Sequence, residues 1–422
     1  MRLSGELQVA GDKSITHRAI ILSSLATGQT VIHDPLLGAD CLSTLEIFKQ
    51  FGVTYQLTAN QLIIDSPGVD GFTYSNSILD AGNSGTTARL LMGVLSALPT
   101  TLTLVGDASL SKRPMKRVTS PLKQMGACIE LTHDQTLPAT IKGQSLNGIE
   151  YELPVASAQV KSAIMLAAMF ASGETKIHEP VPTRDHTEKM FEDFQIVYNK
   201  ETRVITLSGP QMPKTPGQVF VPADISSAAF FMVAALMVEG SDLILKNVGL
   251  NETRCGIVDV LLQMGGRLTI QNERYFGGER VADIRVQYTK DLKGIIIEGE
   301  MIPRLIDEIP IIALLATKAM GQTIIKDAEE LKVKETNRID VTVGELKAIG
   351  ANLFSTEDGM VINGDINLSY HPALVSSHGD HRIAMMLYVA SLLMKNELEI
   401  EEMQAMNISY PDFLVHMQKV LK

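Results

Sequence analysis

The chain has 422 residues, too long for one ordinary hydrophobic core, and this length predicts two domains. Hydrophobic residues make up 45% of it, yet no apolar run reaches membrane-spanning length, which predicts a globular protein of the cytoplasm. The net charge of −11 excludes nucleic acid or an anionic membrane as the main partner, and three scattered cysteines exclude a disulfide framework.

Six segments are apolar on nearly every side and are predicted to form buried helices. They recur about 70 to 80 residues apart along the chain. The segments are 14–26, 86–98, 158–171, 226–238, 307–319 and 381–395.

A similar pattern follows the helices. A short strand comes next, then a charged loop, a second and more polar helix that often ends in glycine, and β-rich segments. We interpret this as an internal repeat of helix, strand, helix, strand and strand, with three copies in each of two domains joined near 216–224. Helices enclosed by strands are unlike a doubly wound sheet, whose helices lie outside.

Groups suited to binding anions recur where these helices are predicted to begin. At the first start, Asp12 or Ser14 is expected to cap the helix, and Lys13 and Arg18 add positive charge to the unpaired N–H groups. A glycine-rich turn, 82–87, can present further N–H groups at the second start. Other starts carry Ser157, Gln159 and Lys161; Asp307 and Glu308; and Asp380, His381 and Arg382.

Charged loops also follow several predicted strands, at 112–114, 183–186 and 334–338. Singly, these features have ordinary structural explanations, such as Asp380 capping a helix or Lys334 and Arg338 lying on a solvated face. Their recurrence at matching points of a repeat favours a shared role. If the helices run parallel and the two domains face each other, a cleft rich in N–H groups, Lys and Arg, with few carboxylates, would bind small polyanions.

Other common site chemistries do not fit the pattern. Asp12 stands where a P-loop requires glycine, and the turn 82–85 is not a nucleophile elbow. No dinucleotide-binding motif follows a strand, and no spacing of His, Cys and carboxylates matches a standard zinc site. We therefore expect neither a metal nor a cofactor.

A set of seven motifs carries a family resemblance. GDKSITHRA, LDAGNSGTTARLL, LSKRPM, SAQVKSA, DEIP, KVKETNRI and GDHRIAM occur together and in order. With them the chain resembles the 5-enolpyruvylshikimate-3-phosphate (EPSP) synthase family, also called 3-phosphoshikimate 1-carboxyvinyltransferases, from Arg2 to about Phe413.

The resemblance implies a fold. It is an α/β inside-out barrel of two domains, each with three βαβαββ units around buried parallel helices. One domain would consist of residues 1–13 and 223–422, the other of residues 14–222, with the active site in the cleft between them.

The resemblance also implies an activity, the transfer of the enolpyruvyl group of phosphoenolpyruvate to the 5-hydroxyl of shikimate 3-phosphate with release of phosphate. The reaction is an addition–elimination without metal, cofactor or covalent enzyme intermediate, in the shikimate pathway to chorismate and the aromatic amino acids. The family is the target of the herbicide glyphosate. We expect a cytoplasmic monomer that binds neither nucleic acid nor membrane.

By motif match, the resemblance assigns Asp307 as the base for the attacking hydroxyl and Glu335 as the group that moves protons at the methylene carbon, with Lys13 as an acid. Shikimate 3-phosphate would contact Lys13, Ser14, Arg18, Ser157, Gln159, Thr183, Asp307 and Lys334. Phosphoenolpyruvate would contact Lys13, Gly85, Arg113, Gln159, Arg338 and Arg382.

One position departs from the family pattern, and two alternative functions fit the sequence less well. Many relatives carry a Lys before a TFPD-like segment near the C-terminus, where this chain has Ile408. The sister enzymes that act on UDP-N-acetylglucosamine usually have a Cys in the loop equivalent to 107–121, which this chain lacks. A non-catalytic binding protein on the same scaffold should have lost Asp307 or Glu335, and both are present.

Overall fold

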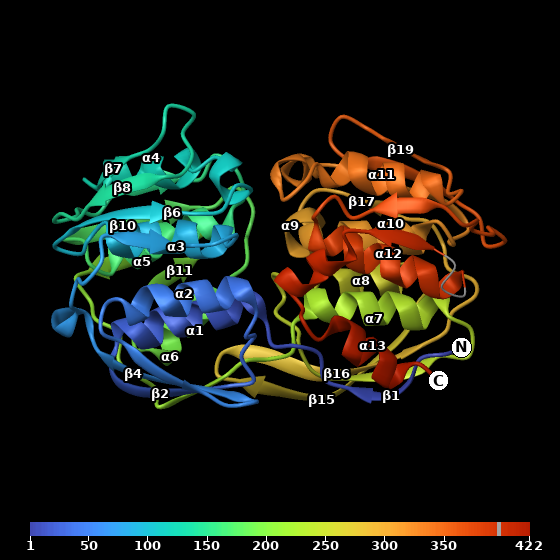
Figure 1. Cartoon of the computed structure of the whole chain (residues 1–422), viewed down its shortest axis with the longest axis horizontal. Helices are drawn as coiled ribbons and strands as arrows, with labels where there is room; N and C mark the ends of the chain where they lie inside the picture. The colour runs from blue at the N-terminus through green and yellow to red at the C-terminus, as the bar shows by residue number, and fades with distance from the viewer. Residues whose placement is uncertain (395–397) are drawn as a thin grey trace. The chain divides into compact units, whose positions relative to one another are not determined.

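The computed structural model describes residues 1–394 and 398–422 (Figure 1). The chain divides into two compact units. We call Gly11–Val221 with Phe276–Glu279 the N-terminal unit, and Met1–Ala10, Pro222–Tyr275 and Arg280–Lys422 the C-terminal unit. The last residue of the predicted helix 381–395 lies outside the described residues.

The N-terminal unit contains three four-stranded sheets with one repeated topology. In each, the first strand pairs parallel to the second, and the other two continue antiparallel. The sheets are β13 (Gln218–Phe220), β2 (Thr27–His33), β4 (Gln61–Pro67) and β3 (Thr54–Leu57); β5 (Ile78–Asp80), β6 (Thr101–Val105), β8 (Ala139–Lys142) and β7 (Cys128–Glu130); and β9 (Glu150–Glu152), β10 (Gly173–His178), β12 (Val204–Gly209) and β11 (Asn199–Glu201).

Three apolar helices lie inside this unit, and three more polar ones accompany them. The inner helices are α1 (Lys13–Leu25), α3 (Gly85–Leu95) and α5 (Ala158–Ala168). The others are α2 (Ala39–Lys49), α4 (Lys116–Gln124) and α6 (His186–Asp193). Helix α3 packs against both α1 and α5. A Cβ atom at Gly93 would lie only 2.2 Å from the carbonyl oxygen of Ala163, so glycine is what allows α3 and α5 to approach so closely.

The C-terminal unit repeats this plan with two four-stranded sheets and one two-stranded sheet. They are β1 (Ser4–Leu7), β14 (Asp242–Gly249), β16 (Glu279–Gln287) and β15 (Arg267–Phe276); β17 (Ile296–Ile297), β18 (Gly321–Ile325), β20 (Met360–Gly364) and β19 (Leu353–Ser355); and β21 (Leu374–Ser376) with β22 (Glu399–Glu401). The first strand of the chain thus belongs to a sheet whose other strands come more than 200 residues later in the sequence.

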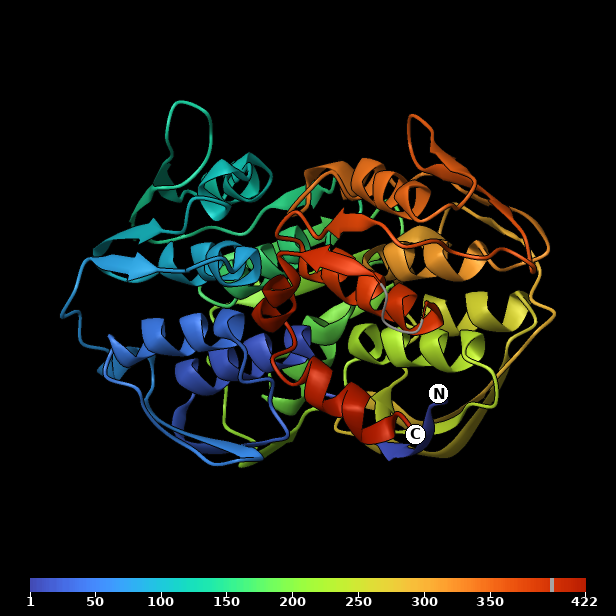
Figure 2. The same ribbon diagram turned by 45° about the vertical axis from the view of Figure 1, so that its right-hand side comes forward.

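The inner helices of this unit are α7 (Ile225–Met237), α10 (Ile309–Ala316) and α12 (His381–Leu393), which pack on one another and lie side by side in Figures 1 and 2. Every residue of α7 from Ile225 to Leu236 is buried, as expected for a helix that is apolar all round. The remaining helices are α8 (Gly256–Gln263), α9 (Met301–Leu305), α11 (Arg338–Ala348) and α13 (Phe413–Val420). None of the helices in the described ranges is long and apolar enough to cross a membrane.

The structure corrects the predicted repeat in its fifth and sixth copies. The fifth inner helix does not begin at Asp307, because Ile306–Glu308 form a 3₁₀ turn and α10 starts after it. Pro310 explains this break, since it has no N–H for a helical bond and fits only a first turn. Within the described residues the sheet of the sixth copy has two strands where the other sheets have four, because the segment after β22 forms a 3₁₀ helix (Met403–Ile408) and α13.

The tip of the β15–β16 hairpin, Phe276–Glu279, belongs to the N-terminal unit, although both strands pair in a sheet of the C-terminal unit. The ring of Phe276 lies 5.9 Å from that of Phe220, and Glu279 accepts a hydrogen bond at 2.7 Å from His186 Nδ1. The sequence did not predict that this hairpin tip belongs to the N-terminal unit, because nothing local distinguishes this hairpin from the others.

Candidate active site

Five of the six inner helices begin with a side-chain cap. Asp12, Ser84, Ser157, Asp224 and Asp380 each accept a hydrogen bond from a backbone N–H of the first turn. Asp12 is therefore the cap of the first helix, and Asp380 does cap the sixth. Helix α10 is the exception, because its N-cap residue Glu308 makes no such bond.

In the N-terminal unit, the first turns of the inner helices contact one another through polar side chains. Arg18 is buried on α1 and donates to Ser162 of α5 at 2.7 Å and to Thr187 of α6 at 2.6 Å. Arg18 Nη1 also donates to the Ser14 carbonyl at 2.9 Å. Lys13 Nζ lies 3.1 Å from Asp40 Oδ2. The starts of parallel helices are thereby brought together, which places N–H groups and cations at the same end of the unit.

Gly85, Arg113 and Gln159 lie in one neighbourhood with Arg89. A Cβ atom at Gly85 would lie 3.1 Å from Arg89 Nη1 and 3.4 Å from Arg113 Nη1. Arg89 Nη1 donates to Gln159 Oε1 at 2.7 Å, and Gln159 Nε2 donates to Thr86 Oγ1 at 3.1 Å. No sequence motif assigned a role to Arg89, although its position one turn after Gly85 on a helix was a usable signal.

Thr183 is held by a buried ion-pair cluster. Its backbone N–H donates to Glu179 Oε1 at 3.0 Å, and its hydroxyl donates to the same oxygen. Lys161 is fully buried, 3.1 Å from Glu179 and 2.7 Å from Glu188. Lys161, which the pattern grouped with the anion-binding residues, is therefore occupied by internal carboxylates and serves the packing of this loop.

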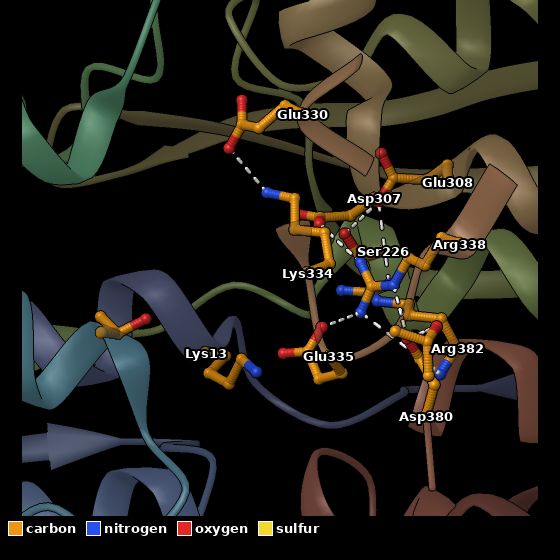
Figure 3. A network of polar contacts seen from close by, with 12 residues as sticks. Lys13, Ser226, Asp307, Glu308, Glu330, Lys334, Glu335, Arg338, Asp380 and Arg382 are labelled. Atoms are coloured by element: carbon orange, nitrogen blue, oxygen red, sulfur yellow. Dashed lines mark hydrogen bonds and ion pairs between the residues drawn. The ribbon is translucent and has the colours of Figure 1, made fainter. Parts of the chain in front are cut away.

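In the C-terminal unit, Arg338 lies at the centre of a network of carboxylates (Figure 3). Its Nε is 2.8 Å from Asp380 Oδ2, its Nη1 is 3.3 Å from Asp307 Oδ1, and its Nη2 pairs with Glu335. Burial alone would lower the pKa of Arg338, but Asp380, Glu335 and Asp307 outweigh it and raise the pKa. Burial likewise acts to raise the pKa of Asp380, and Arg338 outweighs it, so the pKa is lowered.

Asp307 and Glu308 differ in their surroundings although they are adjacent. Asp307 remains 16% exposed, and a second guanidinium, that of Arg254, lies 4.0 Å from its Oδ2. Glu308 is fully buried, hydrogen-bonds the Ser226 hydroxyl and lies 3.9 Å from Arg382 Nη1. Asp307 is thus the member of the pair that solvent reaches.

The two remaining residues of interest lie nearer the surface. Lys334 Nζ pairs with Glu330 at 2.8 Å, and both side chains are partly exposed. Ile408, the position at which the family resemblance leads us to expect a Lys, ends the 3₁₀ helix Met403–Ile408 that packs on α12.

The two units thus carry different chemistry. The N-terminal unit has cations near its helix starts, where Lys13 pairs with Asp40. The C-terminal unit instead interleaves guanidinium groups with carboxylates, whereas the sequence predicted few carboxylates. Such a mixture is suited to moving protons as well as binding anions. The members of this mixture are Arg254, Arg338, Arg382, Asp224, Asp307, Glu308, Glu335 and Asp380.

Comparisons with known proteins agree over the whole chain. The family model for EPSP synthase (3-phosphoshikimate 1-carboxyvinyltransferase) matches residues 1–417. The 3-phosphoshikimate 1-carboxyvinyltransferase of Bacillus pumilus (strain SAFR-032) is 49% identical over 421 residues, covering 100% of this chain and 98% of the relative. That of Oceanobacillus iheyensis is 50% identical over 422 residues, covering 100% and 97%.

Solved structures support the same assignment. EPSP synthase from Acinetobacter baumannii matches with a TM-score of 0.87 at 42% identity, covering 99% of this chain and 96% of that chain. The enolpyruvyl transferase NikO from Streptomyces tendae matches with a TM-score of 0.78 at 17% identity, covering 99% of this chain and 95% of that chain. At this low identity the match supports the fold alone. The predicted class, a mixed α/β fold of two domains, is confirmed. The chain belongs to the EPSP synthase family.

Proposed function

We propose that this protein transfers the enolpyruvyl group of phosphoenolpyruvate to the 5-hydroxyl of shikimate 3-phosphate and releases phosphate. Family membership over the full length supports the reaction. The placement of Asp307 carries the proposal most directly, because this carboxylate caps no inner helix, stays partly exposed and is contacted by Arg338 at 3.3 Å. Two guanidiniums near this carboxylate favour its charged form, which is the form that can accept a proton from a hydroxyl.

Substrate binding is proposed to use both units. Cations and helix starts suit phosphate and carboxylate groups, because charge-assisted hydrogen bonds to them are strong. For shikimate 3-phosphate the groups are Lys13, Ser14, Arg18, Ser157, Gln159 and Thr183, with Asp307 and Lys334 on the ring hydroxyls. For phosphoenolpyruvate they are Lys13, Gly85, Arg113, Gln159, Arg338 and Arg382.

The proposed chemistry is an addition followed by an elimination. Asp307 takes the proton of the 5-hydroxyl as its oxygen bonds to C2 of phosphoenolpyruvate, and the methylene carbon gains a proton from Glu335 or Lys13. The methyl group of the adduct then returns a proton as the C2–O bond to phosphate breaks. Positioning and charge stabilisation account for the rate in this scheme, which uses no metal, cofactor or covalent enzyme intermediate.

A phosphate-release assay tests the function. Phosphate should appear when shikimate 3-phosphate and phosphoenolpyruvate are added together and not when either is added alone. Replacing shikimate 3-phosphate by UDP-N-acetylglucosamine separates this activity from that of the sister enzymes. Release with the nucleotide sugar, or with phosphoenolpyruvate alone, would contradict the proposal.

We further propose that the protein acts as a monomer in the cytoplasm.

A further inference from the structure

Arg254 contacts the first turn of α7 and lies near Asp307. It follows β14 and precedes α8, and its side chain is 3% exposed. Its Nη2 donates to Asp224 Oδ1 at 3.1 Å and to Ser226 Oγ at 2.8 Å. Its Nη1 lies 4.0 Å from Asp307 Oδ2. One planar guanidinium therefore hydrogen-bonds the cap of a buried helix and lies within ion-pair distance of the proposed catalytic carboxylate.

We propose that Arg254 is a positioning residue for proton transfer, which keeps the Asp307 carboxylate ionised and in place. This inference rests on the function proposed above, in which Asp307 is the base. The anchor is rigid, because Asp224 is fixed by its own bond to the backbone N–H of Ser226 at 2.8 Å. A fixed cation beside a carboxylate favours its charged form, the form that accepts a proton.

The charges around Asp307 show why a second guanidinium is needed. Arg338 contacts the other carboxylate oxygen at 3.3 Å, but it also pairs with Asp380 and Glu335. In the proposed mechanism Arg338 must in addition hold phosphoenolpyruvate, so its charge is shared further when the substrate is bound. Arg254 has no assigned ligand, so in this scheme the substrate does not draw its charge away from Asp224 and Asp307.

The neighbouring residues Glu308 and Arg382 contact groups other than Asp307. Glu308, next to Asp307, hydrogen-bonds Ser226 and lies 3.9 Å from Arg382. Arg382 therefore faces Glu308, while Asp224 compensates the charge of Arg254 at 3.1 Å. The two carboxylates of the DEIP motif thus face different arginines: Asp307 lies near Arg338 and Arg254, and Glu308 lies near Arg382.

Arg254→Met tests the inference, with Arg254→Lys as a second variant that keeps the charge but not the planar fork. We expect kcat of Arg254→Met to fall about 10- to 100-fold, because a small displacement of a reacting group has such an effect. The KM values should change less than about threefold. The acid limb of the kcat–pH profile should move to higher pH by about one unit, since removing a cation raises the pKa of a nearby carboxylate. Arg254→Lys should show a smaller shift.

A matched control and a double-mutant cycle complete the test. Arg285 lies in the same unit and pairs with Asp242 at 2.5 Å, so Arg285→Met should leave the acid limb unchanged. In an Asp307→Asn background, Arg254→Met should cause no further loss of kcat. An equal loss in both backgrounds, or an unshifted acid limb, would overturn the role of Arg254. A near-normal kcat for Asp307→Asn alone would instead overturn the proposed role of Asp307 itself.

Discussion

Arg338 and Asp380 form a buried ion pair that ties two helix starts together. Arg338 Nε lies 2.8 Å from Asp380 Oδ2, and the side chains are 2% and 0% exposed. Asp380 also accepts from the backbone N–H of Arg382 at 2.8 Å as the cap of α12, while Arg338 is the first residue of α11. The Asp380 carboxylate thereby contacts the guanidinium of Arg338 and the backbone of Arg382, two residues proposed to bind phosphoenolpyruvate.

Asp380→Asn should therefore destabilise the protein although Asn caps helices as well as Asp does. The amide keeps the cap but removes the charge that compensates buried Arg338, and breaking such a pair costs about 3 kcal/mol of unfolding free energy. Thermal and denaturant unfolding at pH 7 will measure the loss. Asp340→Asn, an exposed change in the first turn of α11, is the control and should have little effect. Equal stability of the two variants would show that Asp380 acts only as a cap.

His17 is predicted to make the N-terminal unit sensitive to acid. It is fully buried, hydrogen-bonds Thr44 at 2.8 Å, and burial lowers its pKa from 6.5 to about 3. Below pH 6.5 the unfolded chain binds a proton that the folded protein does not, so stability falls as the pH decreases towards 3. At pH 5 this linkage amounts to about 2 kcal/mol.

His17→Gln should remove that part of the acid sensitivity. Denaturant unfolding at pH 7 and pH 5 will compare the slopes of stability against pH, with His133→Gln as the control because His133 is fully exposed. If wild type and His17→Gln lose the same stability between the two pH values, His17 is protonated in the folded protein and this account is wrong.

Much of this architecture could be predicted because the six inner helices are apolar on every side, a local property of the sequence. Strands such as β2 and β10 followed from the repeat. The apolar pattern predicts that the fifth helix begins at Asp307, which is too early. The pattern does not show that Ile306–Glu308 form a 3₁₀ turn before Pro310. The repeat also predicted strands in the sixth copy that do not form. That segment is a 3₁₀ helix that packs on α12.

The candidate site was predictable in its motifs but not in its counter-ions. Lys13 and Asp40 are separated by 27 residues, Arg18 and Ser162 by 144, and Arg338 and Asp380 by 42. Such pairs depend on which helix starts meet in space, and one sequence contains no signal for them. The sequence likewise did not predict a role for Arg254, because only the fold brings it near Asp307.

Gly85→Ala should weaken the binding of phosphoenolpyruvate. The added methyl group would lie 3.1 Å from Arg89 Nη1 and 3.4 Å from Arg113 Nη1, both ends of flexible side chains, so the fold should survive while the guanidiniums move. We expect KM for phosphoenolpyruvate to rise about tenfold, with a smaller change in kcat. Gly344→Ala is a matched control, because no atom lies within 4 Å of its added methyl group on α11. Unchanged KM in Gly85→Ala would place the ligand elsewhere.

Turnover should not depend on a divalent metal. The proposed site uses cationic side chains and helix starts in the place of a metal ion. Phosphate release with both substrates should therefore survive prolonged treatment with EDTA and its removal by gel filtration, with a change of less than about twofold. Loss of activity that added Mg²⁺ or Zn²⁺ restores would contradict the metal-free mechanism.

Asp307→Asn separates catalysis from binding and from helix stability. The amide keeps the size and most hydrogen bonds of Asp307 but cannot accept the proton of the attacking hydroxyl. We expect kcat to fall about 10²- to 10⁴-fold, the usual range for loss of a general base, with small changes in either KM. Stability should fall less than in Asp380→Asn, because buried Arg338 keeps its pairs with Asp380 and Glu335.

Arg382→Ala provides the contrast. It removes a charge-assisted contact proposed for phosphoenolpyruvate, so KM for that substrate should rise more than kcat falls. Steady-state kinetics of both variants, with circular dichroism to confirm folding, distinguishes the roles. If folded Asp307→Asn turns over at a near-normal rate, the hydroxyl proton goes to another group, and Glu335 is then the first alternative because it shares the guanidinium of Arg338.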